Sequence, residues 1–111
     1  MNFLNPKWSP DGTKIVFHSL FEDIKHERGA IYVMQADGTQ VKKLTDDSNY
    51  NFNPFFSPDG KQISFNVGDN DGHISIHIMD LDGSNQVCVT DAASLVIGSD
   101  NKCRNRSETS H

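Results

Sequence analysis

The side chains of this sequence best suited to metal binding or proton transfer are its histidines, because imidazole does both near neutral pH. Comparing the chain with itself aligns His18 with Asn66. His77 aligns with Tyr32, so both histidines occupy ordinary positions of a repeat. We therefore expect no metal site among the four histidines within patterned sequence, which are His18, His26, His73 and His77.

An acidic segment, Asp69-Asn70-Asp71-Gly72, resembles part of a calcium loop, because closely spaced carboxylates and amides supply the oxygen ligands that Ca²⁺ prefers. The preceding acidic position of such a loop is Val67 here, and no glutamate follows to act as a bidentate ligand. The segment is predicted to be a solvated turn.

Nucleophilic catalysis has no signature in the sequence. A Gly-x-Ser-x-Gly elbow is absent, and Gly98-Ser99-Asp100 has no strand-turn-helix context. Asp11 and Asp59 belong to repeated Ser-Pro-Asp-Gly segments, in which aspartate forms turns. We predict no catalytic residue, no cofactor site and no enzymatic activity.

The strongest pattern in the chain is an internal repeat. Residues 5–17, Asn-Pro-Lys-Trp-Ser-Pro-Asp-Gly-Thr-Lys-Ile-Val-Phe, recur in closely similar form as residues 53–65, 48 positions later. A second pair, Ile31–Thr39 and Ile76–Ser84, recurs 45 positions apart. A period of 45 to 48 residues with strand-like content is typical of β-propeller blades, whereas helical repeats would show a 3.6-residue apolar rhythm.

Each repeat is expected to fold as four antiparallel strands joined by hairpins. Ser9-Pro10-Asp11-Gly12 predicts a tight turn, in which proline presets φ at the second position and glycine adopts the left-handed conformation. Asp37-Gly38 predicts a two-residue hairpin. Proline is expected to open the first strand of each repeat, on a sheet edge. The expected strands are residues 5–9, 13–19, 31–35 and 41–45, then 53–57, 61–67, 73–79 and 86–90.

Two polar segments, Leu20–Gly29 and Gly68–Gly72, are expected to be loops on one rim of the blades. Loops on a rigid scaffold often carry binding residues, so these two are the segments best placed to contact a partner. The sequence assigns no individual partner-binding residue. Trp8 and Phe56 stand at the same position of the two repeats, and we expect both to pack between blades.

Composition limits what the chain binds. Its 111 residues carry a net charge of -5, so a surface for nucleic acid or an anionic membrane is not expected. No apolar run approaches the roughly 20 residues that span a bilayer. Met1–Asn5 lacks the features of a secretion signal. Cys88 and Cys103 can pair only in an oxidising compartment, and two free thiols are the default expectation.

The predicted fold class is all-β, with two consecutive four-stranded antiparallel blades in residues 1–91, at about 5–46 and 53–91. Residues 92–111 are a polar tail without a third Ser-Pro-Asp-Gly segment. Ser94–Ile97 is a candidate strand, and Lys102–Glu108 is expected to be disordered. The tail is either a degenerate third blade or an irregular extension.

The paired Asn-Pro-x-Trp/Phe-Ser-Pro-Asp-Gly-x-x-Ile-x-Phe and Ile-Tyr/His-Val/Ile-Met-x-x-Asp-Gly motifs resemble the TolB-type, WD-repeat-like propeller family over residues 5–91. Phe56 replaces the usual tryptophan and His77 the usual tyrosine. The resemblance implies a noncatalytic, periplasmic scaffold that binds protein partners and links inner-membrane machinery to a peptidoglycan-associated lipoprotein.

Similar repeats occur in the gating propellers of prolyl-oligopeptidase and dipeptidyl-peptidase enzymes. One propeller scaffold carries many functions, so part of such a propeller, with its catalytic domain elsewhere, is the alternative. A repeat pair without a present function is a third interpretation, and the lack of a signal leaves a cytoplasmic location open.

Two blades leave two outer sheet faces uncovered. A face four strands wide and five residues long measures about 320 Å². Leaving it in water forgoes about 8 kcal/mol, which is comparable to the stability of a whole domain. We therefore expect the chain either to be part of a longer protein or to associate with further copies through its blade faces.

Overall fold

In the computed structural model, residues 3–22, 27–46, 48–68, 72–89, 95–97 and 103–105 are described. These residues form strands and turns only, and none of them forms a helix that could cross a membrane. The strands are β1 (Leu4–Trp8), β2 (Lys14–Glu22), β3 (Glu27–Gln35), β4 (Lys42–Lys43), β5 (Tyr50–Phe56), β6 (Gln62–Gly68), β7 (Ile74–Asp80), β8 (Val87–Cys88), β9 (Leu95–Ile97) and β10 (Cys103–Asn105).

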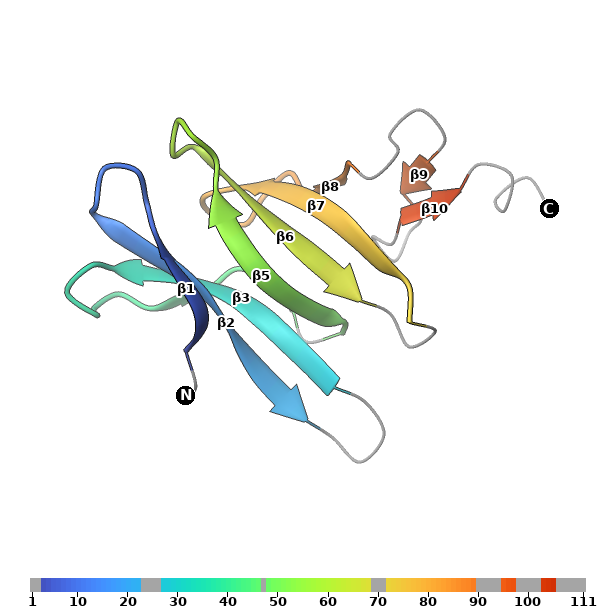
Figure 1. Cartoon of the computed structure of the whole chain (residues 1–111), viewed down its shortest axis with the longest axis horizontal. Coiled ribbons are helices and arrows are strands. Elements are labelled where there is room, and N and C mark those ends of the chain that lie inside the picture. Colours follow the sequence, from blue (N-terminus) through green and yellow to red (C-terminus); the bar gives the residue numbers. More distant parts are fainter. Residues whose placement is uncertain are drawn as a thin grey trace.

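Strands β1 to β4 form one antiparallel meander, blade 1, and β5 to β8 form a second, blade 2 (Figure 1). A single parallel bridge between Gly29 of β3 and Tyr50 of β5 joins the two blades into one open eight-stranded sheet. The prediction of two successive four-stranded antiparallel blades is confirmed.

Side chains alternate along each strand, so each blade has two faces, which we call front and rear. The rear of blade 1 packs on the front of blade 2, and together they form the hydrophobic core. The rear of blade 1 carries Val16, His18, Ile31, Val33 and Leu44. The front of blade 2 carries Phe56, Ile63, Phe65, His77 and Met79.

Both inner strands contain a β-bulge that the sequence encodes as Asn-Pro. Asn5 and Asn53 have positive φ values of 49° and 54°, and the pairing register shifts beside each of them. Asparagine tolerates this left-handed conformation, and proline offers no N–H to the ladder. The prediction that proline opens each first strand is wrong, because Pro6 and Pro54 lie inside β1 and β5, at the bulge.

The Ser-Pro-Asp-Gly segments form the predicted tight turns. The Gly12 N–H donates to the Ser9 carbonyl at 2.9 Å, and the Gly60 N–H donates to the Ser57 carbonyl at 2.9 Å. The φ values of Gly12 and Gly60 are 74° and 73°, which confirms the left-handed conformation expected at the fourth position.

The hairpin at Asp37-Gly38 is not the predicted two-residue turn. The Gly38 N–H donates to the Gln35 carbonyl at 2.8 Å, and the Gln35 N–H donates to the Thr39 carbonyl at 2.9 Å. With a φ of 86°, Gly38 is the fourth residue of the turn that starts at Gln35 and forms a bulge, which is the usual three-residue hairpin loop. The two-residue prediction is wrong because Ala36 also belongs to the loop.

The second and third strands of blade 1 are longer than predicted. β2 continues to Glu22 and pairs with β3 from its first residue, Glu27. The predicted loop Leu20–Gly29 is therefore wrong for most of its length, because a backbone ladder can continue through polar residues. In the predicted loop Gly68–Gly72, Gly68 belongs to β6 and residues 69–71 lie outside the described part.

The outer strands and the tail also differ from expectation. β4 and β8 have two residues each, although one further bond extends each ladder, from Leu44 to Ile31 and from Val89 to Ile76, both at 2.8 Å. β9 (Leu95–Ile97) confirms the candidate strand for residues 95–97, and residue 94 lies outside the described part. β9 pairs with β10, so the disorder expected for residues 102–108 is wrong at 103–105. The division of the chain near residue 91 stays a prediction.

Candidate functional site

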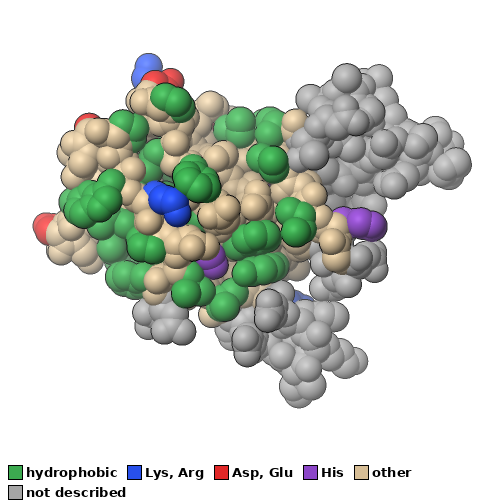
Figure 2. Space-filling view, viewed as in Figure 1, with side chains coloured by type: hydrophobic (Ala, Val, Ile, Leu, Met, Phe, Trp, Pro, Cys, Tyr) green, Lys and Arg blue, Asp and Glu red, His purple; other side chains and the backbone are tan. Residues whose placement is uncertain are grey.

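The inner strands β1 and β5 present aromatic and basic side chains to solvent. Trp8 is 63% exposed and Phe55 is 44% exposed. The Lys7 ammonium lies 4.6 Å from the centre of the Phe55 ring, a cation–π distance. In Figure 2 hydrophobic side chains spread across the face that includes β1 and β5, and the acidic side chains drawn in colour lie at its margin. We call Lys7 and Phe55 the inner-edge cluster; Trp8 points to the opposite face of β1 from Lys7.

The Asn51 side chain links the two blades by a hydrogen bond. It is 5% exposed, and its amide donates to the Gly29 carbonyl at 2.9 Å. Weaker bonds reach the carbonyls of Asp46 at 3.3 Å and Asn49 at 3.4 Å. A methyl group at position 29 would lie 2.9 Å from the Asn51 carbonyl oxygen, so this close approach of β3 to β5 requires glycine.

His18 makes a second bond between the blades. It is 3% exposed, and its Nδ1 accepts the Asn53 N–H at 3.2 Å. The rings of Tyr50 and Phe52, stacked 4.4 Å apart, lie edge-on to the imidazole at 6.2 and 6.4 Å. Burial, together with the charge of Lys7, lowers the pKa of His18 below its ordinary 6.5. The ring is thus a neutral acceptor that joins β2 to β5.

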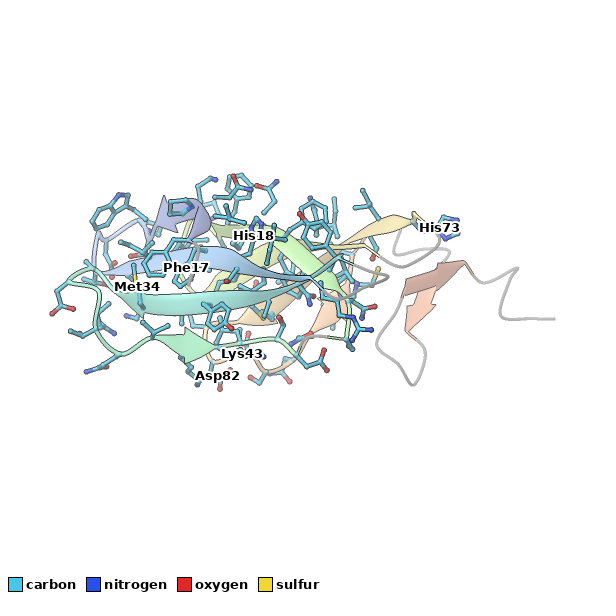
Figure 3. All side chains as sticks on the ribbon, turned by 90° about the horizontal axis from the view of Figure 1, so that it is seen from below. Phe17, His18, Met34, Lys43, His73 and Asp82 are labelled. Carbon is cyan, nitrogen blue, oxygen red and sulfur yellow. The ribbon has the colours of Figure 1, made fainter. Side chains whose placement is uncertain are left out.

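Within the described part of the chain, His73 and His77 do not join His18 in a site. His77 is 2% exposed, its Nε2 lies 3.1 Å from the Ser75 hydroxyl, and burial lowers its pKa. His73 is exposed and lies far from His18 (Figure 3). Within the described ranges, no three His, Cys, Asp or Glu side chains group as metal ligands do. His26 lies outside those ranges.

A small polar cavity of about 110 Å³ lies where the blades meet. A water molecule takes about 30 Å³ of liquid volume, and ligand pockets typically exceed about 300 Å³, so this cavity suits a few waters. Its polar groups already have local partners: the Thr45 hydroxyl accepts the Ile31 N–H at 3.0 Å, and the Asp46 carboxylate accepts the Ser48 N–H at 3.0 Å. The cavity is lined by Leu44, Thr45, Asp46, Ser48, Asn49, Asn51, Val67, His77 and Gln86.

The repeated aspartates lie in turns and accept local hydrogen bonds. Asp11 accepts the hydroxyls of Thr13 and Ser9, both at 2.7 Å, and the Thr13 N–H at 3.0 Å. These bonds lower the pKa of Asp11 to about 2. Asp59 accepts the Ser57 hydroxyl at 2.6 Å and the Lys61 N–H at 3.0 Å, and its pKa is lowered for the same reason.

The two residues predicted to pack between blades have different surroundings. Phe56 packs against the core between the blades, as expected. Trp8 occupies the same repeat position on the front of blade 1 and is largely exposed, so the prediction is wrong for Trp8. The reason is positional: blade 2 has blade 1 before it, whereas no blade of the described chain precedes blade 1.

Several sequence candidates fall outside the described residues, namely the acidic segment at 69–71 and Gly98-Ser99-Asp100. Cys88 is disulfide-bonded, so the expectation of two free thiols is wrong. Sequence reasoning missed Asn51 and Gly29. One signal was available: Asn51 aligns with Phe3 and Gly29 with Ile74, so both positions depart from the repeat.

The strand plan and the bulged inner strands agree with a family comparison. The TolB beta propeller domain family matches residues 1–103. The chain belongs to this family. A structural comparison supports this, since the TolB-type chain superposes on a solved protein from Agrobacterium tumefaciens assigned as TolB, with a TM-score of 0.60 and 29% identity. The match covers 75% of this chain and 31% of the solved one.

Curated relatives of this TolB-type chain carry different names. The Tol-Pal system protein TolB of Alcanivorax borkumensis is 38% identical over 64 residues, which are 58% of this chain and 14% of that protein. The uncharacterized peptidase YuxL of Bacillus subtilis is 35% identical over 68 residues, or 61% of this chain and 10% of that protein. The uncharacterized protein Atu1656 of Agrobacterium fabrum is 33% identical over 78% of this chain and 28% of its own length. The chain thus spans less than a third of each of these three relatives.

Proposed function

We propose that this TolB-type chain is a noncatalytic scaffold that binds a protein partner through its inner-edge cluster. The observation that carries the proposal is the exposed Phe55 ring under the Lys7 ammonium, which joins the inner strands of the two blades. Exposed aromatic side chains next to a cation are enriched at protein interfaces. Side chains that could act in catalysis have structural roles instead. His18 accepts a hydrogen bond from β5, and Asp11 accepts hydrogen bonds within a turn.

The partner suggested by the family resemblance is a peptidoglycan-associated lipoprotein in the periplasm. The similarity to the Tol-Pal system protein TolB of Alcanivorax borkumensis supports this choice. The disulfide at Cys88 also fits, because disulfides persist in oxidising compartments such as the periplasm. The paired ends of β2 and β3, at residues 20–22 and 27–29, would lie at the rim of that contact.

The scaffold proposal is tested by isothermal titration calorimetry of the chain with the soluble domain of the peptidoglycan-associated lipoprotein from the same organism. We expect saturable binding that Phe55→Ala weakens at least tenfold, since loss of a central aromatic anchor costs about 2 kcal/mol or more. Val41→Ala is the matched control, because Val41 has the same exposed fraction of 44% but lies beside the outer strand β4. Absence of binding, or equal weakening by both variants, contradicts the proposal.

A second candidate function is part of the gating propeller of a serine peptidase. The similarity to the uncharacterized peptidase YuxL favours it. Sequencing across both ends of the coding region separates the two functions: a hydrolase domain in the same reading frame supports the peptidase, and an α/β domain with a signal peptide supports the scaffold. The chain itself is expected to remain unlabelled by a fluorophosphonate probe, which reacts with activated serines.

A further inference from the structure

The two free faces of the molecule repeat the two faces that already pack together inside it. The front of blade 1 carries residues at the repeat positions of the front of blade 2, namely Trp8, Ile15, Phe17, Tyr32 and Met34. Trp8 is exposed, whereas Phe17 is buried, with the Phe3 ring packed on it at 4.4 Å between ring centres, and Met34 is buried too. The rear of blade 2 carries residues at the repeat positions of the rear of blade 1, namely Ser64, Asn66, Ile76, Ile78 and Val89. We propose that the chain assembles front to rear with a second copy of itself, by repeating the contact between its own blades.

The rear of blade 2 is more apolar than the rear of blade 1, which is buried. Blade 1 has Lys7, Gly29 and Lys42 at three rear positions. At the matching positions blade 2 has Phe55, Ile74 and Val87, which are 44%, 62% and 46% exposed. An apolar sheet face with such exposure marks an interaction surface.

One polar pair of the internal junction is replaced by an apolar pair on the two outer faces. Inside the molecule the Asn51 amide bonds the Gly29 carbonyl at 2.9 Å. The matching free residues are Phe3, which is 49% exposed on the front side of blade 1, and Ile74 on the rear of blade 2. A polar residue facing glycine has been replaced at both positions by large apolar residues. In a front-to-rear contact these two would pack against each other.

A polar contact of the internal junction can also be repeated. The Asn53 N–H donates to His18 Nδ1. The matching free residues are Asn5, which has the same positive φ as Asn53, and Asn66. The side-chain oxygen of Asn66 is an acceptor that can take the place of the imidazole nitrogen. This bond would fix the register between two copies.

The turn at Gly38 leaves space for a neighbouring blade, as the turn at Gly83 does inside the molecule. A methyl group on Gly83 of blade 2 would lie 2.8 Å from the Leu44 carbonyl oxygen of blade 1, so the turn sits directly on the neighbouring blade. Gly38, at the matching turn of blade 1, has nothing within 4 Å of such a methyl group. The backbone of Val89 from a second copy would occupy this open space.

A front-to-rear contact uses different surfaces on the two copies, so it either closes into a ring or continues as a filament. Propeller rings have roughly four to eight blades, which corresponds to about two to four copies of this two-blade chain. Front-to-rear assembly needs no partner protein, so its failure would leave the scaffold function untouched. Where it forms, it covers the rear face that carries Phe55, so assembly and partner binding compete for that face.

Size-exclusion chromatography with light scattering tests the assembly over a range of protein concentrations. We expect the mass to rise from 12.4 kDa to a whole multiple of that value, between two and four. Trp8→Lys blocks the front and Ile76→Lys blocks the rear, and both side chains are already exposed, so each variant should fold and remain at 12.4 kDa. Asn49→Lys adds the same charge away from both free faces and should assemble like the parent chain.

Mixing the two blocked variants gives the decisive result. Each retains the face that the other lacks, so an equimolar mixture should form a complex of twice 12.4 kDa that neither variant forms alone. A parent chain that stays at 12.4 kDa at every concentration overturns the proposal, since other molecules would then have to cover the faces. A mixture that stays monomeric, or a blocked variant that still assembles alone, overturns it as well.

Discussion

At the scale of single residues, Asp11 shows how a repeated turn is held. Its carboxylate accepts two hydroxyls and one N–H. The Thr13 hydroxyl is the largest cause of its low pKa, so Thr13→Val should raise the pKa of Asp11 from about 2 toward 3.8. Carboxyl titration followed by NMR measures this. Thr39→Val, the same change at another turn, should leave the pKa of Asp11 unchanged; an unchanged value in Thr13→Val would contradict the assignment.

The sign of the pH effect follows from the lowered pKa of Asp11. Folding favours the carboxylate, so the stability contributed by Asp11 is complete above about pH 3.8 and is lost as the pH falls through about 2. The pKa values of Asp37, Asp46, Asp59 and Asp82 are lowered for the same kind of reason. Acid therefore weakens several turns of the chain with the same sign.

Asn51 is the residue on which the junction of the blades depends most. Asn51→Ala removes the buried amide and leaves the Gly29 carbonyl without that donor, which should lower the free energy of unfolding by about 1 to 3 kcal/mol. Urea denaturation measures the loss. Asn49→Ala is the matched control, because the half-buried Asn49 amide makes a long bond of 3.5 Å, to the neighbouring Ser48 hydroxyl, and its loss should change stability by less than about 0.5 kcal/mol. Equal losses would show that the Asn51 amide has no special role.

Residues whose partners are near in sequence could be predicted, and those with distant partners could not. The Ser-Pro-Asp-Gly turn is written in four consecutive residues, and the structure has it as expected. Asn51 and Gly29 are 22 positions apart, and His18 and Asn53 are 35 apart. No local pattern specifies those pairs, because they exist only once two blades are packed. The exposure of Trp8 was missed for the same reason.

At the scale of strands and turns, the bond between β2 and β5 should make the junction sensitive to pH. Folding lowers the pKa of His18, so the stability it contributes is complete above its unfolded value of 6.5 and decreases as the pH falls below that value. The urea concentration at the unfolding midpoint should therefore decrease when the pH is lowered from 7.5 to 5.5. His18→Asn, which copies the residue of blade 2, should reduce this slope, whereas an identical slope would contradict a neutral His18. His77 contributes the remaining slope with the same sign.

The turn after β7 offers a comparison within one molecule. Gly83 and Gly38 have φ values of 88° and 86°, so alanine at either position should cost about 1 to 2 kcal/mol in backbone strain. Gly83→Ala should cost at least about 1 kcal/mol more than Gly38→Ala, because only its methyl group meets the Leu44 carbonyl. Thermal unfolding of the dilute monomer compares them. Equal losses would mean that the turn does not press against blade 1.

Strand number and order could be predicted because the repeat fixes both, but strand lengths could not. Polar residues from 20 to 29 indicated a loop, yet β2 and β3 pair through most of them. The outer strands are shorter than their apolar pattern suggested. The Asn-Pro pair was predicted to open a strand because proline has no N–H to donate. A bulge tolerates that lack equally well, and only the positive φ of Asn5 and Asn53 distinguishes a bulge from a strand start.

At the scale of the whole molecule, the two blades stack in one direction, front to rear. This leaves the front of blade 1 and the rear of blade 2 as the two outer faces. The side view in Figure 3 places Phe17 and Met34 of blade 1 toward one end of the molecule, and Lys43 and Asp82 along one of its long sides. The Ser84 hydroxyl and N–H chiefly lower the pKa of Asp82, and the charge of Lys42 across the junction adds a smaller effect, whereas hydrophobic packing joins the blades within.

The central claim is that two four-stranded antiparallel blades pack front to rear, and a NOESY spectrum of the isotopically labelled chain tests it most directly. We predict cross-peaks from the side chains of Val16, Ile31 and Val33 to those of Ile63, Phe65 and Met79, together with backbone contacts between Gly29 and Tyr50. Two intact ladders without cross-peaks between these groups, or strands paired in any other order, would contradict it.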